Sequence, residues 1–227
     1  ITCRDWSSDV CSSDLEIVLG YGAYSVQPGI LNKLIRFDTL FVAMQYMSFA
    51  ITGMPYMGVG RNLLYRKDLF FKAGGFMRHY KISSGDDDLF INEVAKSSNT
   101  RIQPAAEAVT FSKPKQTFGS WFRQKRRHLT TGGFYRFGHK FALGLYSFSQ
   151  LAFFGLLIAL AVMGVDWMLL TGIFLLRLIT QLIIVKKSMI KLGEKNFLLL
   201  VPFFEVFLMI TNLLLGFAGL FSRKTQW

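Results

Sequence analysis

The sequence has little cysteine and little charge. Its two cysteines, Cys3 and Cys11, both lie near the start of the 227 residues, so we expect neither a disulfide framework nor CxxC chemistry in the folded part. Charged residues make up 18% of the chain, against about a quarter in a soluble domain, and hydrophobic residues make up 52%. This composition excludes both a disordered chain and a wholly soluble globule.

Residues 1–15 (ITCRDWSSDVCSSDL) match neither a folded segment nor a targeting peptide. Ser-Ser-Asp occurs twice, and no basic stretch precedes an apolar one. The segment resembles translated sequencing-adapter read-through, so we expect a non-native leader, with a genuine disordered arm as the alternative. It contains one arginine and three aspartates, a net charge of −2, so the remainder carries +14 rather than the +12 of the whole chain. Glu16 then opens an apolar, strand-like run, and we expect the chain to be truncated at its N-terminus.

Long apolar runs fill the C-terminal part of the chain. About 20 apolar residues cross the hydrocarbon of a bilayer, so each run predicts a transmembrane helix. The region 141–222 contains three such runs, at 141–165, 167–185 and 196–222, and a short tail at 223–227 follows. Residues 31–52 form a shorter, mostly apolar stretch, which we interpret as a buried or interfacial helix, with a further span as the alternative.

Residues 113–140 contain eight lysines and arginines and no acid. They connect a soluble part, expected over residues 16–116, to the first apolar run. Lys and Arg beside a span are retained on the cytoplasmic side, so we expect an integral membrane protein whose soluble part is cytoplasmic, in the inner or plasma membrane if the source is bacterial. Nucleic-acid binding is the other use of a basic patch, but membrane placement is favoured and no nucleic-acid partner is expected.

Three consecutive aspartates, Asp86, Asp87 and Asp88, follow Ser84 and Gly85. Neighbouring carboxylates raise each other's pKa, and an acid with a raised pKa in a cleft is a candidate general base. The competing explanation is a helix N-terminus, capped by Ser84 and with acids over its first turn.

Residues 117–140 are expected to form a basic amphipathic interface helix followed by a collar. At 100° per residue, one face of this helix is apolar and another is polar. The apolar face holds Phe118, Trp121, Phe122 and Leu129, and the polar face holds Gln124, Arg127, His128 and Thr131. An interfacial helix needs only this amphipathic pattern. The alternative is that Gln124 and Arg127 bind a diphosphate, which suits the fork of an arginine.

A third motif is Gly58-Val59-Gly60-Arg61, whose two glycines would allow a ligand close to the backbone. Alone this signal is weak, and an ordinary turn is the favoured explanation. In this order, ahead of membrane spans, the three motifs resemble the second half of the processive, membrane-integrated family-2 glycosyltransferases, the class of cellulose synthase and hyaluronan synthase. Gly85-Asp86-Asp87 resembles the acidic motif of that family, and the segment from Gln124 resembles its Gln-x-x-Arg-Trp motif, with His128 in place of tryptophan.

The resemblance covers about residues 16–222. It implies an α/β fold joined to an all-α membrane part: the C-terminal half of a GT-A-like domain, an interfacial helix and about three transmembrane helices. The implied activity is inverting transfer of a sugar from a nucleotide-sugar donor to a glycan or lipid acceptor. Two classes remain as alternatives: a non-catalytic multi-pass protein such as a channel or transporter subunit, and a regulatory module that binds nucleotides or anionic lipid through residues 113–140.

The resemblance also implies roles for single residues. Asp87 would be the general base, supported by Asp86. Binding of the donor diphosphate or the acceptor would involve Gln124, Arg127, His128, Gly58, Gly60 and Arg61. A divalent metal, Mg or Mn, is expected in the full-length enzyme, with its ligands mostly in an N-terminal half that is not present before Glu16. This fragment alone is therefore expected to hold no metal and to be inactive.

Arg177 and Glu205 are the only full charges inside the three predicted spans, and their signs are opposite. A charge at mid-bilayer costs about 2.5–3.5 kcal/mol on insertion scales, so it normally faces the bundle and finds a partner. We expect the two residues to pair or to line a polar path for the glycan or lipid head. Snorkelling without any contact is the alternative.

Overall fold

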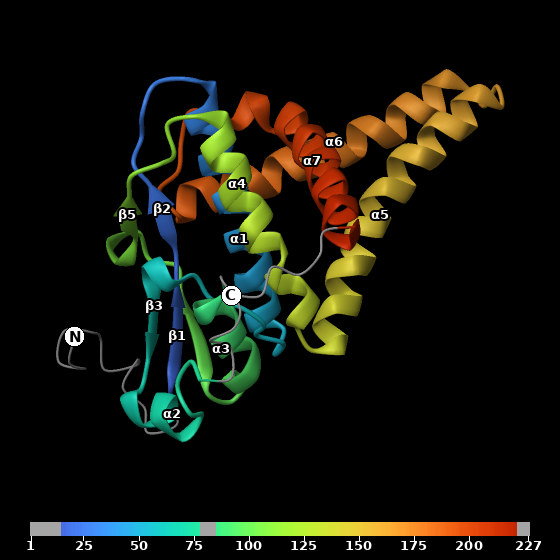
Figure 1. Cartoon of the computed structure of the whole chain (residues 1–227). Coiled ribbons are helices and arrows are strands. Elements are labelled where there is room, and N and C mark those ends of the chain that lie inside the picture. The colour runs from blue at the N-terminus through green and yellow to red at the C-terminus, as the bar shows by residue number, and fades with distance from the viewer. Residues whose placement is uncertain (1–14, 78–84, 222–227) are drawn as a thin grey trace.

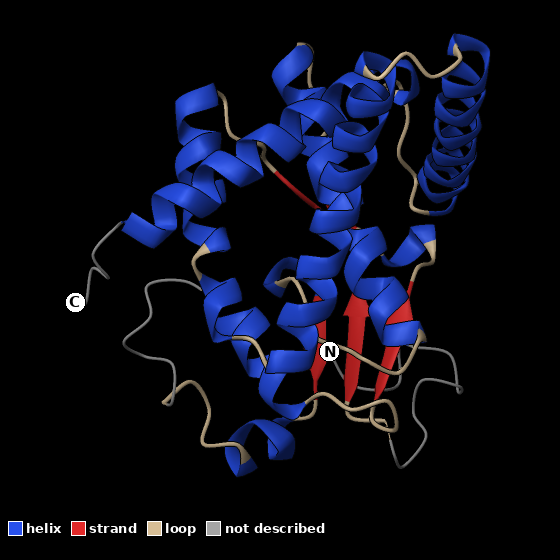
Figure 2. Cartoon of the chain, turned by 90° about the vertical axis from the view of Figure 1, so that its right-hand side faces the viewer, coloured by secondary structure: helices blue, strands red, loops and turns tan. Residues whose placement is uncertain are grey.

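The computed structural model describes residues 15–77 and 85–221. Most of the described chain is helical, with a few short strands at one end and long helices at the other (Figure 1). The helices α1 and α4 lie between the strands and the helices α5, α6 and α7 (Figures 1 and 2). The structure therefore has the expected part that contains strands and helices and the expected part of long apolar helices, and helices outnumber strands in the described chain.

The strands form two small sheets. In the first, β1 (Ile17–Gly20) lies between β3 (Leu63–Tyr65), which is antiparallel to it, and β4 (Thr100–Gln103), which is parallel. In the second, β2 (Gly22–Tyr24) pairs in parallel with β5 (Thr110–Ser112). The prediction of a buried strand after Glu16 is confirmed: β1 has neighbours on both sides and all its residues are buried, which explains its uninterrupted apolar sequence.

Helix α1 (Ile30–Ile51) packs against the strands and also against α6 and α7. It is long and apolar enough to cross a membrane, yet 44% of its most apolar window is buried within the protein. The structure therefore contains four helices that could span a membrane by length and composition, where the sequence led us to expect three and one buried or interfacial helix.

Short elements connect the strands. These are η3 (Gly60–Asn62), α2 (Lys67–Lys72), α3 (Asp86–Val94) and η4 (Ala106–Ala108). The three aspartates open α3, as the helix N-terminus explanation requires, but the N-cap is Gly85, whose φ of 90° favours glycine. The cap expected from the sequence, Ser84, lies outside the described residues.

The C-terminal region is a succession of helices: α4 (Phe118–Leu129), η5 (Thr131–Phe134), α5 (Phe137–Val162), α6 (Trp167–Lys191), η6 (Leu198–Leu200) and α7 (Val201–Phe221). Helices are present at the segment expected to form the interface helix and at the three apolar runs. One boundary differs: α6 continues to Lys191, beyond the end of the predicted apolar run 167–185. Lysine is a good helix former and is favoured at a helix C-terminus, so the helix absorbs this segment.

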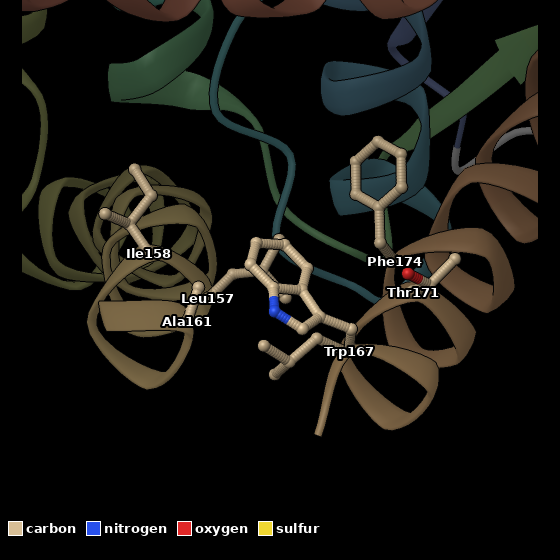
Figure 3. A pocket seen from close by; sticks show the side chains of 7 residues that line it. Leu157, Ile158, Ala161, Trp167, Thr171 and Phe174 are labelled. Carbon is tan, nitrogen blue, oxygen red and sulfur yellow. The ribbon is translucent and has the colours of Figure 1, made fainter. Parts of the chain in front are cut away.

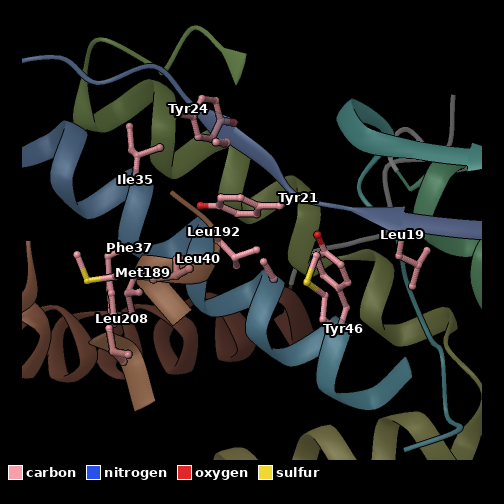
Figure 4. Packing of buried hydrophobic residues seen from close by; sticks show 14 of the residues in the cluster. Leu19, Tyr21, Tyr24, Ile35, Phe37, Leu40, Tyr46, Met189, Leu192 and Leu208 are labelled. Atoms are coloured by element: carbon pink, nitrogen blue, oxygen red, sulfur yellow. The ribbon is translucent and has the colours of Figure 1, made fainter. Parts of the chain in front are cut away.

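One hydrophobic core connects the strands to the apolar helices. It contains residues of β1 and β2, much of α1, and Met189, Leu192 and Leu208 from the C-terminal region (Figure 4). A buried charge pair joins the same elements: Arg36 of α1 bonds Glu194 in the turn after α6, and the second oxygen of Glu194 accepts a hydrogen bond from the Tyr21 hydroxyl at 2.8 Å. The strands are thus fixed to the turn between two apolar helices.

Candidate functional site

A cavity of about 460 Å³ lies where the strands, α1, α4 and α5 meet. Three of the residues expected in a binding site line it: Arg61, Gln124 and His128. Sequence reasoning assigned no binding role to several others that line it, which include Tyr24, Asp38, Asp88, Trp121, Lys125 and Tyr135. The cavity therefore brings together Arg61 of the glycine motif, Asp88 of the acidic motif and the polar face of α4.

The polar face of α4 divides between the cavity and solvent. The side-chain amide of Gln124 donates to the Tyr24 hydroxyl at 3.2 Å, inside the cavity. His128 lines the cavity, whereas Arg127 is exposed and is not among the cavity residues. The structure therefore does not place the predicted diphosphate fork of Arg127 in the cavity wall.

Asp87 contacts the glycine motif directly. Its Oδ2 accepts a hydrogen bond from the backbone N–H of Gly60 at 2.5 Å, and its Oδ1 accepts one from the N–H of Asp88 at 3.0 Å. The acidic motif and the glycine motif, which are 27 residues apart, are thereby held together. Each carboxylate oxygen keeps a further lone pair that can accept a substrate hydroxyl. Asp86, by contrast, is exposed at the start of α3.

The two glycines serve close packing. A Cβ on Gly58 would lie within 3.0 Å of side-chain atoms of Leu63 and Leu19, and a Cβ on Gly60 would lie 2.9 Å from Oδ2 of Asp87. The expectation that both glycines leave room for a ligand is wrong for Gly58, because core side chains occupy that space. Gly60 is instead required for the approach of Asp87.

Asp88 is the functional candidate that sequence reasoning missed. Its side chain is buried, and its Oδ2 accepts hydrogen bonds from Thr131 at 2.8 Å and from the Tyr135 hydroxyl at 2.7 Å. Its Oδ1 is buried without a hydrogen-bond partner among the described residues. Burial is the main cause that raises the pKa of Asp88, although the two hydroxyl donors act in the opposite direction. Asn92, one helical turn later, is also buried, so this face of α3 points inward, and only the structure shows it.

His128 lies close enough to Asp87 and Asp88 of α3 for their charges to act on it. Desolvation in the cavity and the neighbouring Arg127 lower the pKa of His128, and the charges of Asp87 and Asp88 partly oppose that shift. The residue that replaces the tryptophan of the family motif is thus next to the acidic motif. A neutral imidazole here can donate one hydrogen bond and accept another.

Two cations of the cavity are already engaged. The Arg61 guanidinium lies 4.1 Å from the ring centroid of Tyr24 and donates to the carbonyl of Ala23 at 3.0 Å. The Lys125 ammonium bonds Asp38 of α1 at 2.7 Å, and both side chains are largely buried. The charge of Lys125 is therefore compensated by a carboxylate, whereas Arg61 is held by a carbonyl and an aromatic ring.

The apolar face of α4 packs on a neighbouring helix. Trp121 is buried and stacks on Phe207 of α7 at a centroid distance of 6.2 Å, and Phe118 contacts the same ring edge-on. Trp121 therefore holds α4 against α7. The more exposed Leu129 remains available to a membrane interface.

Inside the apolar helices, Arg177 and Glu205 form an ion pair with a closest distance of 2.5 Å. The second partner of Glu205 is Gln150 of α5, whose side-chain nitrogen lies 3.1 Å from Oε1 of Glu205 and 2.8 Å from the Tyr146 hydroxyl. Gln150 and Tyr146 line the cavity, whereas the ion pair does not. The pair is thus connected to the cavity wall through one glutamine.

The three aspartates do not converge on a common point. Asp86 is exposed, Asp87 contacts Gly60 and Asp88 contacts Thr131 and Tyr135. Over the described ranges, 15–77 and 85–221, no group of three or more His, Cys, Asp or Glu side chains is placed to hold a metal ion. The residues present do not by themselves fit a divalent cation.

A second hollow, of about 230 Å³, lies between α5 and α6 (Figure 3). Its lining is apolar except for Thr171, and Trp167 and Phe174 project into it from α6. No titratable side chain lines this hollow, so it offers no chemistry for a reaction.

Comparison with known proteins adds no relative. No protein-family model matches the chain, and no curated protein matches it. The assignment of function therefore rests on the motifs and on the geometry of the cavity.

Proposed function

We propose that this chain carries the acceptor side of an inverting membrane glycosyltransferase. The observation that supports this most strongly is the meeting of three motifs that are distant in sequence. Asp87 contacts Gly60, and the charges of Asp87 and Asp88 act on His128 in the wall of the cavity. A channel or transporter subunit has no need for this arrangement at the border between a sheet and its apolar helices.

The proposed reaction is a direct displacement at the anomeric carbon of a nucleotide sugar. Asp87 takes the proton from an acceptor hydroxyl, the hydroxyl oxygen forms a bond to the anomeric carbon, and the bond from that carbon to the diphosphate breaks. The configuration at the anomeric carbon inverts. A carboxylate on the acceptor side and positive charge near the leaving diphosphate are what this step requires.

The leaving group would be stabilised by α4. Arg127 is exposed and precedes His128 of the cavity wall, and Gln124 lies about one turn earlier on α4. A bound divalent cation would neutralise further charge on the diphosphate, through ligands that the resemblance places mostly in a donor-binding half outside this chain. We propose that the basic residues 113–140 keep this site on the cytoplasmic face.

The experiment that tests the proposal is sugar transfer by the complete product of the gene that encodes this chain. Purified protein in lipid nanodiscs is offered a panel of nucleotide sugars, and the anomeric configuration of the product is determined by NMR. We expect transfer with inversion from one donor. Transfer with retention, or no transfer from any donor while the protein is folded, would contradict the proposal and favour the non-catalytic or lipid-binding alternatives.

A further inference from the structure

The cavity continues from the candidate site along the apolar helices. At the site it is lined by Arg61, Gln124 and His128, and farther along by Phe41 and Val42 of α1 and Leu143 of α5. Its volume of about 460 Å³ falls within the range of about 300–1,000 Å³ that is usual for small-molecule sites. A ligand that fills it must therefore be polar at one end and apolar at the other.

The polar end suits an uncharged head group. Lys125 is paired with Asp38, and Arg61 is bonded to Ala23 and stacked on Tyr24. The carboxylates of Asp38 and Asp88 line the same cavity, so its two cationic side chains give no excess of positive charge for an anionic head group. The other polar groups at this end, Gln124 and the Tyr24 hydroxyl to which it donates, are neutral hydrogen-bonding side chains, which suit hydroxyl groups.

The wall between α1 and α5 is thin. The ring contact between Phe41 and Tyr146, with centroids 5.9 Å apart, bridges the two helices at the cavity. Helix α5 is otherwise little covered: none of its most apolar window is buried, and Ser147 in the cavity wall is itself exposed. A lipid in the bilayer can therefore reach the cavity from the side, by displacement of one aromatic pair.

We propose that this cavity binds the acceptor, and that the acceptor is a neutral lipid with a free hydroxyl in its head group. The inference rests on the proposed function, because it places the hydroxyl at the end of the cavity next to the acidic helix. The hydrocarbon chain lies between α1 and α5. Asp88 lines that end of the cavity and Asp87 precedes it on α3, so an acceptor hydroxyl bound there lies near the proposed base.

The test is photocrosslinking to the chain itself in nanodiscs, with a diacylglycerol that carries a diazirine in one acyl chain. Mass spectrometry locates the crosslinks. We expect them on α1 and α5 at residues that line the cavity, and we expect excess 1,2-dioctanoylglycerol to reduce them at least fivefold. Cellopentaose and farnesyl phosphate serve as competitors for a glycan site and an anionic-lipid site, and should have little effect.

Two variants of α5 that differ by one position form a matched pair. Ser147→Trp places a large ring in the cavity and should reduce crosslinking at least fivefold, whereas Phe148→Trp changes an adjacent side chain that is 65% exposed and does not line the cavity. Leu143→Trp is the second blocking variant if Ser147→Trp is not monodisperse. Equal crosslinking in the blocking variants and in Phe148→Trp, or stronger competition by cellopentaose or farnesyl phosphate than by dioctanoylglycerol, would overturn the inference.

Failure of this inference differs from failure of the proposed function. Crosslinking requires no sugar transfer, so specific crosslinks in a protein that transfers no sugar would preserve the lipid site and remove the reaction. Sugar transfer to a soluble glycan, without specific lipid crosslinks, would preserve the reaction and overturn the lipid acceptor.

Discussion

Removal of one member of the pair between Arg177 and Glu205 should destabilise the protein, and removal of both should do so much less. Glu205 is 7% exposed and Arg177 is 23% exposed, and both lie on helices that are long and apolar enough to cross a membrane. We consider Arg177→Met, Glu205→Leu and the double variant, because these substitutions preserve apolar volume while they remove charge.

The expected magnitudes follow from the contacts of each residue. A single unpaired charge in a span costs about 2.5–3.5 kcal/mol. Arg177 also lies 4.9 Å and 4.7 Å from the ring centroids of Phe153 and Phe154, and cation–π contacts of this kind contribute about 0.5–2 kcal/mol. Arg177 therefore retains partners in Glu205→Leu, and we expect a loss of roughly 1–3 kcal/mol there, smaller than the roughly 2–4 kcal/mol in Arg177→Met.

The assay is thermal unfolding of the purified chain in detergent, analysed as a double-mutant cycle. At roughly 2–4 °C per kcal/mol for a chain of this size, each single variant should melt several degrees below the wild type. The double variant should recover to within about 1 kcal/mol of wild type, a coupling of at least about 1 kcal/mol. Lys187→Met, which removes an exposed charge from the same helix, is the control. Losses in the double variant equal to the sum of the two single losses would refute a stabilising pair.

Three further predictions concern the soluble part and its junction with the helices. The folded-state pKa of Asp88 is raised, so the wild type should lose stability relative to Asp88→Asn as pH rises from about 4 through that pKa. The melting temperatures of both proteins between pH 4 and 8 measure this difference. A difference in melting temperature that stays constant with pH would contradict burial of the charge. Arg36 is 2% exposed in its pair with Glu194, so Arg36→Met should cost about 3–5 kcal/mol in denaturant unfolding, and a cost below about 1 kcal/mol would contradict the role of this pair. Arg127→Lys keeps the charge but loses the fork, so in the full-length enzyme it should weaken sugar transfer at least tenfold, and unchanged kinetics would leave α4 with an interfacial role only.

Patterns within one element were sufficient to predict much of the fold. The uncharged run from Phe141, the amphipathic period of residues 118–131 and the apolar run after Glu16 correspond to α5, α4 and β1. The opposite charges of Arg177 and Glu205 also led to the correct contact, because a low-dielectric surrounding leaves such groups few other partners.

Contacts between distant segments could not be predicted in this way. Arg36 and Glu194 are 158 residues apart, and nothing in either local sequence indicates the other. Asp88 was indistinguishable from its two neighbours until the fold showed which of the three aspartates faces inward. The role of Gly58 was misjudged for the same reason, since only the packed structure shows Leu19 and Leu63 beside it.

The most direct test of the central claim is the rate of sugar transfer by Asp87→Asn in the full-length enzyme, measured together with the affinity for the nucleotide sugar. The matched control is Asp68→Asn, which changes an exposed aspartate of α2 that pairs with Arg66. Our account predicts that kcat falls at least 100-fold in Asp87→Asn, that donor affinity changes less than threefold, and that Asp68→Asn behaves as the wild type. Transfer by Asp87→Asn at the wild-type rate would contradict it.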